Sequence, residues 1–138
     1  MGAEAQLAKK AGQELGFATD LGCYTEAVEE GLRGCRTVML ESNYDDGMIL
    51  VSDYPYYLKR RIQSRSGHLS NSDCAAALPA LAQNGTRNFV LGHLSQNNNL
   101  GLLAQQASEQ ALLQAGLERG DFTLQIANRS QLSQPVLL

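Results

Sequence analysis

Three ionisable residues stand directly after short apolar segments that have the composition of β-strands. Asp20 follows ELGFAT, Glu41 follows RTVML, and His93 follows NFVLG. In open α/β sheets, functional groups gather beyond the carboxyl ends of the strands. Carboxylate and imidazole groups suit zinc, manganese and iron, and a carboxylate can bridge two ions. These residue types therefore predict metal-assisted hydrolysis at one edge of a sheet.

His68, the other histidine, stands in a Gly-His-Leu-Ser segment, as His93 does. Ser70 is the expected N-cap of a helix that begins at Asn71. The N–H groups at such a terminus attract phosphate, and His68 beside them could protonate a leaving oxygen. Spacing alone leaves a zinc site incomplete, because the chain has no HxH, HxxxH or DxH pattern. The alternative is ordinary turn, cap and surface roles for all of these residues.

The composition limits the classes of function. The chain has 138 residues, 43% of them hydrophobic, and a formal net charge of −3, which fits one globular domain. The negative charge gives no case for bulk nucleic-acid or membrane-surface binding, although residues 59–65 carry a basic run that is either functional or a solvated helix face. Its apolar runs are far shorter than the roughly twenty residues of a membrane helix. Three widely spaced cysteines without a CxxC pair favour reduced thiols in the cytoplasm.

The elements that must position these residues alternate between strands and helices. Strands are expected at Glu14–Thr19, Arg36–Leu40, Asn88–Leu91 and Phe122–Ala127. Helices are expected at Thr25–Leu32, at about Asp45–Val51 and Tyr56–Ser64 with a break at Asp53-Tyr54-Pro55, at Asn71–Gln83 with a kink or early stop at Pro79, and at about Leu100–Leu117. The order β-α-β-α-α-β-α-β predicts an α/β fold. Residues 1–12 are interpreted as a polar surface segment and residues 13–138 as the domain.

Four segments resemble the C-terminal half of metallo-β-lactamase-fold hydrolases. They are ATDLG (18–22), LESNYD (40–45), YPYYLKRRIQSRSGHLSN (54–71) and LGHLSQNN (91–98). The branch they resemble is the WalJ (YycJ)-like group, with ribonuclease Z a more distant relative. The resemblance implies half of an αβ/βα sandwich, whose complete site would hold two divalent metal ions, zinc or manganese.

The resemblance also implies roles for individual residues. Asp20 matches the aspartate that bridges the metal ions, and His93 matches a metal-ligand histidine. His68 matches the histidine that aids the leaving group, and Glu41 matches the acidic residue paired with it. The chain would then cleave phosphodiester bonds in the manner of a nuclease.

The chain departs from the family pattern in two ways. Tyr44 stands where the branch commonly has histidine, and the HxHxDH signature is absent. We therefore expect a fragment that completes its site only with a missing N-terminal half and has little turnover alone. Ser70 and Asn71 would hold the scissile phosphate, an inference from the helix terminus.

Two other functions remain open. One is an inactive remnant or docking half that acts only with a partner chain. The other is a binding module that uses the helix N-termini at Ser70 and Asn99 for an anion.

Overall fold

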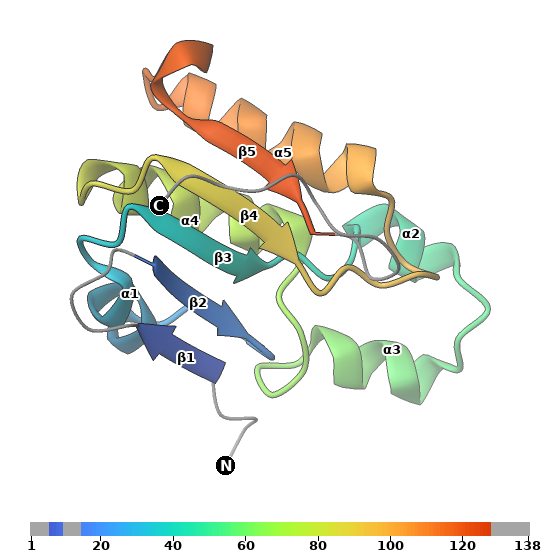
Figure 1. The fold of residues 1–138 in the computed structure, drawn as a ribbon. Helices are drawn as coiled ribbons and strands as arrows, with labels where there is room; N and C mark the ends of the chain where they lie inside the picture. The colour runs from blue at the N-terminus through green and yellow to red at the C-terminus, as the bar shows by residue number, and fades with distance from the viewer. Residues whose placement is uncertain (1–5, 10–14, 128–138) are drawn as a thin grey trace.

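A five-stranded sheet forms the frame of the computed structural model, which describes residues 6–9 and 15–127 (Figure 1). The strands are β1 (Gln6–Lys9), β2 (Leu15–Thr19), β3 (Thr37–Glu41), β4 (Asn88–Gly92) and β5 (Thr123–Ile126), and they lie in that order. Strands β2 to β5 run parallel, whereas β1 pairs antiparallel with β2. The four parallel strands therefore end at the same edge of the sheet.

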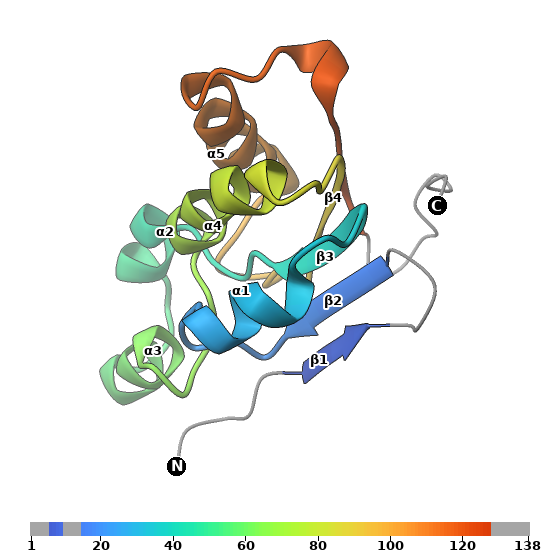
Figure 2. The ribbon, with the colours of Figure 1, turned by 90° about the vertical axis from the view of Figure 1, so that its left-hand side faces the viewer.

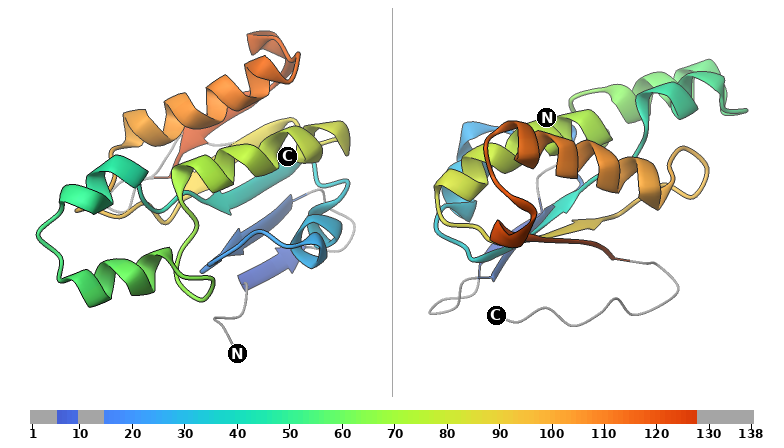
Figure 3. Two further views of the ribbon diagram at one scale, coloured as in Figure 1. Left: turned by 180° about the vertical axis from the view of Figure 1, so that it is seen from behind. Right: turned by 90° about the horizontal axis from the view of Figure 1, so that it is seen from above.

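Helices cover one face of this sheet. They are α1 (Glu26–Leu32), α2 (Asp46–Val51), α3 (Tyr56–Gln63), α4 (Asn71–Gln83) and α5 (Gly101–Gln114). The side view in Figure 2 and the two views in Figure 3 place α1, α4 and α5 against that face. In Figure 1, α2 and α3 extend past the carboxyl ends of the strands. No helix in the described ranges is long and apolar enough to cross a membrane.

The core lies between the sheet and these helices. Val38 and Leu40 of β3 and Phe89 and Leu91 of β4 are buried there, with side chains of α1, α4 and α5. Because side chains alternate along a strand, residues 39 and 41 point to the other face. The apolar pattern of β3 thus places Glu41, its last residue, on the face of the sheet opposite α1, α4 and α5.

The α/β fold class is confirmed, and the four parallel strands lie where they were expected. The two helices expected on either side of Asp53-Tyr54-Pro55 are confirmed as α2 and α3, although the predicted element order counted them as one. The predicted early stop at Pro79 is wrong, since α4 continues to Gln83. Burial of Leu78 and Leu81 on either side of Pro79 holds the helix together there.

The N-terminal segment also differs from expectation. The polar composition of residues 1–12 predicted only a surface segment, yet residues 6–9 form β1 and pair with β2. Backbone groups supply such pairing whatever the polarity of the side chains. The remaining residues of that segment lie outside the described ranges, and the domain boundary at residue 12 stays a prediction.

Candidate metal centre

Four ionisable side chains meet at the carboxyl edge of the sheet. The candidate ligand atoms of Asp20, Glu41, His68 and His93 all lie within 4.8 Å of one another. Three of these residues come from neighbouring strands, since Asp20 follows β2, Glu41 ends β3 and His93 follows β4. His68 comes from the loop between α3 and α4. The structure therefore brings together the residues that were predicted as metal ligands and as the catalytic pair.

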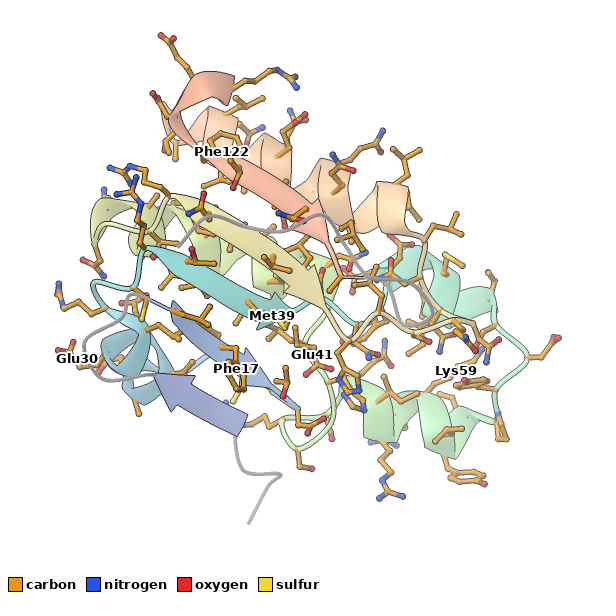
Figure 4. The ribbon with its side chains drawn as sticks, in the orientation of Figure 1. Phe17, Glu30, Met39, Glu41, Lys59 and Phe122 are labelled. Atoms are coloured by element: carbon orange, nitrogen blue, oxygen red, sulfur yellow. The ribbon has the colours of Figure 1, made fainter. Side chains whose placement is uncertain are left out.

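Glu41 lies at the centre of this cluster, at the end of β3 in Figure 4. Its side chain is fully buried. Oε1 accepts a hydrogen bond from the Leu21 backbone N–H at 2.8 Å, and Oε2 lies 2.7 Å from His68 Nδ1 and 2.9 Å from His93 Nδ1. An ionised carboxylate only accepts, so both Nδ1 atoms donate. Each ring keeps Nε2 for another partner, which is how carboxylates orient metal-binding histidines.

The contact between Glu41 and His93 was missed by sequence reasoning, which paired Glu41 with His68 alone. In the register of the sheet, Glu41 faces Gly92 across β3 and β4. The next residue, His93, is then the nearest one that can turn toward the carboxylate. The signal in the sequence is that both residues end apolar strands, but only strand order makes them neighbours.

Asp20 and His93 share an uncommon backbone conformation. Both have a φ of 57°, and they are the non-glycine residues with positive φ in the described part of the chain. Asp and His tolerate this left-handed region better than most residues, yet it costs about 1–3 kcal/mol. Such strain is concentrated at functional sites. Here it turns the chain sharply after β2 and β4, and the Asp20 Oδ1 atom lies 3.6 Å from His93 Nδ1.

The loop that carries His68 packs tightly against the loop after β2. A Cβ atom added at Gly22 would overlap the backbone carbonyl of Arg65, and one at Gly67 would overlap the carbonyls of Arg61 and Ile62. Only glycine permits such close backbone approach. These two contacts hold His68 within reach of a cluster whose other members come from the sheet.

Glu41 also shifts the protonation of His68. The pKa of His68 is raised, chiefly because its ring donates a hydrogen bond to Glu41. Partial burial acts in the opposite direction, and the charges of Glu41 and Asp20 add to the rise. The protonated, positively charged ring is therefore favoured.

We expect the ring protons of His68 to titrate, in an NMR experiment with EDTA present, above the ordinary pKa of about 6.5. Because the folded-state pKa is raised, this coupling stabilises the fold fully below the unfolded-state pKa, and that stability is lost as pH rises through the folded-state value. Glu41→Gln should remove most of the rise. A His68 pKa at or below the ordinary value in the unchanged chain would contradict the hydrogen bond.

Ser70 and Asn71, the predicted phosphate ligands, are both buried. Ser70 caps α4, because its Oγ accepts a hydrogen bond from the Asp73 N–H at 3.0 Å. The Asn71 Oδ1 atom accepts from Ser42 Oγ at 2.7 Å and from Asn99 Nδ2 at 2.9 Å. Both side chains thus have partners within the protein, and their contact with a phosphate stays a prediction.

Buried amides form a network that sequence reasoning missed. Asn99 Nδ2 donates to the carbonyls of Ser42 and Asn43, at 2.9 and 3.1 Å, and Asn43 Nδ2 donates to the carbonyl of His93 at 2.7 Å. The network ties the segment after β3 to the segment after β4. The sequence signal for this network is the run of three asparagines at residues 97–99, because buried amides require hydrogen-bond partners.

Tyr44 replaces the histidine that is common at this position in the resembled branch. It is buried, and burial raises the pKa of its hydroxyl to about 12. Its carbonyl accepts a hydrogen bond from the Asn71 N–H at 2.8 Å. Tyr44 is therefore neutral at ordinary pH and links the segment after β3 to the start of α4.

Curated relatives cover most of this chain. It is 33% identical over 109 residues to a Bacillus anthracis protein named exodeoxyribonuclease YycJ, an alignment that covers 79% of this chain and 41% of the relative. It is 36% identical over 105 residues to exodeoxyribonuclease WalJ of Streptococcus pneumoniae serotype 2 (strain D39 / NCTC 7466), covering 75% of this chain and 39% of the relative. The chain spans about two fifths of the length of these relatives. No family model matches it.

The carboxyl edge of the parallel sheet thus presents two carboxylates and two imidazoles, a donor set that could hold a divalent metal ion. Over the aligned residues, the chain belongs to the WalJ (YycJ)-like branch of the metallo-β-lactamase family. The resemblance carried by the four sequence segments is thus confirmed.

Proposed function

We propose that this chain supplies part of the active site of a metal-dependent phosphodiesterase that cleaves nucleic acid. The observation that carries the proposal is the meeting of Asp20, His68 and His93 around the buried carboxylate of Glu41. The exodeoxyribonuclease names of the relatives support nucleic acid as the class of substrate. A cytoplasmic location is part of the proposal and is supported by the wide spacing of the cysteines.

The donor set fits divalent zinc or manganese, because both ions accept imidazole nitrogen and carboxylate oxygen. Asp20 and His93 would hold such ions, and the family resemblance implies that Asp20 would be shared between two of them. Glu41 fixes the ring of His93 through Nδ1, so that Nε2 is the donor. Bound ions would polarise the phosphodiester and lower the pKa of water. The remaining ligands would come from a segment of the relatives that this chain does not span.

His68 is the proposed general acid. Glu41 holds its Nδ1, and the ring lines a cavity beside the cluster. Its raised pKa keeps a proton on Nε2, from which the ring can protonate a leaving oxygen. We place the scissile phosphate between His68 and the N-terminal turn of α4, at Ser70 and Asn71.

The first test measures metal content after dialysis against Mn²⁺ or Zn²⁺, and nuclease turnover on labelled DNA. The chain is assayed alone. It is then assayed in a mixture with the part of a relative that lies outside the alignment with this chain. His93→Ala should lower metal affinity by more than about 100-fold, because loss of a group that only orients a ligand already costs about 10–100-fold. His68→Ala should leave metal content unchanged and lower turnover of the mixture about 10²–10⁴-fold. Equal loss of metal and turnover in His68→Ala would contradict the general-acid role.

Asp20→Gly should separate metal binding from stability. The Asp20 side chain is 43% exposed, and its left-handed backbone suits glycine better than aspartate. We expect metal binding to be lost while the free energy of unfolding is unchanged or rises by up to about 1 kcal/mol. Urea unfolding and metal titration measure the two effects, with Asp20→Asn as the uncharged control of similar shape. A variant that keeps its metal would remove Asp20 from the ligand set.

A second function, a docking half that acts only with a partner chain, is favoured by the other face of the sheet. Phe17 of β2 is 40% exposed there and lies in register with Met39 of β3, as Figure 4 shows. No described helix covers these side chains. The partner would be the segment of the relatives that this chain does not span, and a complex of the two without turnover would favour this function.

A further inference from the structure

A cavity of about 370 Å³ opens beside the two histidine rings. Leu58 and Ile62, one turn apart on α3, line it together with Tyr54 and residues 93–98. Its volume lies within the range of about 300–1,000 Å³ that is typical of small-molecule sites. The cavity combines apolar side chains from α3 with amides from the loop after β4.

Tyr54 stands between this cavity and a second one of similar volume. Asn97 Nδ2 donates a hydrogen bond to the Tyr54 hydroxyl at 2.9 Å, and the two residues line both cavities. The bond fixes the position of an aromatic ring beside the cluster. A ring held in this way offers a stacking surface at little cost in conformational entropy.

Asn98 belongs to the loop that forms one wall of the first cavity. Its N–H donates to Ser95 Oγ at 3.1 Å, and its carbonyl accepts from the Asp45 N–H at 2.8 Å. The residue is 1% exposed, and its Oδ1 atom is shielded from solvent. Bonds within the protein therefore hold this wall in place, which lowers the ordering cost of binding a ligand.

We propose that the first cavity binds the base of the nucleotide whose phosphate reaches His68 and His93. In this arrangement the base stacks on Tyr54 and packs against Leu58 and Ile62. The proposal rests on the proposed function, since phosphodiester chemistry is what places a nucleotide here. Every base has a π-face, so binding should depend little on sequence.

The charge around the cavity agrees with a polyanionic ligand. The described residues that line it include no carboxylate. The outer surface of α3 carries Arg60 and Arg61, both exposed, and the Arg60 guanidinium lies 5.7 Å from the centre of the Tyr56 ring. Basic and aromatic side chains together are typical of surfaces that follow a single strand. The rest of the strand would therefore pass along α3.

The test is an NMR titration in EDTA, so that no metal contributes. Thymidine 5′-monophosphate and 2-deoxyribose 5-phosphate are added separately, and the methyl signals of Leu58, Ile62 and Leu94 are followed. The nucleotide should shift these signals and bind at least about 5-fold more tightly than the sugar phosphate, because stacking requires the base. Tyr54→Ala should weaken nucleotide binding by about 5–100-fold.

Two further variants keep the result interpretable. Tyr57→Ala removes a neighbouring tyrosine that is 74% exposed and lines neither cavity, and it should bind as the unchanged chain does. Tyr54→Phe loses the bond to Asn97 but keeps the ring, so it should retain most of the affinity even where Tyr54→Ala does not fold. Equal binding of nucleotide and sugar phosphate, or signals that do not move, would overturn the proposal.

This outcome is separable from that of the proposed function. Base-dependent binding without metal uptake or cleavage would support the cavity and reject the phosphodiesterase. Metal-dependent cleavage without base-dependent shifts would support the phosphodiesterase and reject base binding in the cavity.

Discussion

Glu41→Ala is expected to lower the free energy of unfolding by about 2–4 kcal/mol. The substitution removes the acceptor of three donors, the Leu21 N–H and the Nδ1–H groups of His68 and His93. Leu21 is buried, so its N–H has no access to water. The two rings also lose the carboxylate that orients them, so we expect metal affinity to fall about 10–100-fold.

Urea unfolding followed by circular dichroism measures the first effect, and metal titration measures the second. Glu41→Gln is the matched control, because it keeps the shape and an acceptor for Leu21 but loses the charge that faces two N–H donors. It should lose less stability than Glu41→Ala and nearly as much metal affinity. A Glu41→Ala variant within about 0.5 kcal/mol of the unchanged chain, the range of ordinary surface substitutions, would show that the carboxylate does not organise this site.

Gly22→Ala is expected to destabilise the chain by about 1–3 kcal/mol or more and to move His68 out of the cluster. The added methyl group would overlap the carbonyl of Arg65, which is backbone and cannot rotate away. Relief requires the loop between α3 and α4 to move off the loop after β2. Because His68 would then lose its bond to Glu41, its pKa should fall toward the ordinary value.

Gly120→Ala is the control for this prediction. A Cβ atom at Gly120 has nothing within 4 Å, so the substitution should change the free energy of unfolding by no more than about 0.5 kcal/mol. The two variants differ in a single methyl group placed in a crowded or an open position. Equal stability, together with an unchanged His68 titration, would mean that the two loops do not touch.

The part of the site that could be predicted follows from strand ends. Asp20, Glu41 and His93 each come after an apolar segment, and parallel strands end at one edge of a sheet. Their proximity thus needed only the fold class. His68 is different, because its position depends on the contact of Gly22 with the distant backbone of Arg65 and on the tight turn at Gly67. Nothing in the spacing of residues predicts the contact of Gly22.

Other features depended on tertiary structure. A proline within a helical pattern is locally unfavourable, and only burial of the surrounding α4 side chains keeps the helix intact beyond Pro79. Asn71 and Asn99 have the same chemistry in an exposed turn as in a buried network, so the sequence pattern did not separate the two. Strand β1 forms because its backbone groups pair with the open edge of β2. Such pairing does not require a particular side-chain pattern, so the sequence did not predict it.

The spacing of hydrogen-bonded strands in the sheet determines how far apart the residues of this centre begin. Neighbouring strands lie about 4.8 Å apart, so the backbones that leave β2 and β4 are separated by two such steps, roughly 9.6 Å, with β3 midway between them. The sharp turns at Asp20 and His93 bring their side chains back across that gap. A slip of β3 by one residue would carry Glu41 to the opposite face and leave both imidazoles without the acceptor that binds their Nδ1 atoms. The position of Glu41 relative to the two rings can therefore change only in discrete steps of strand register.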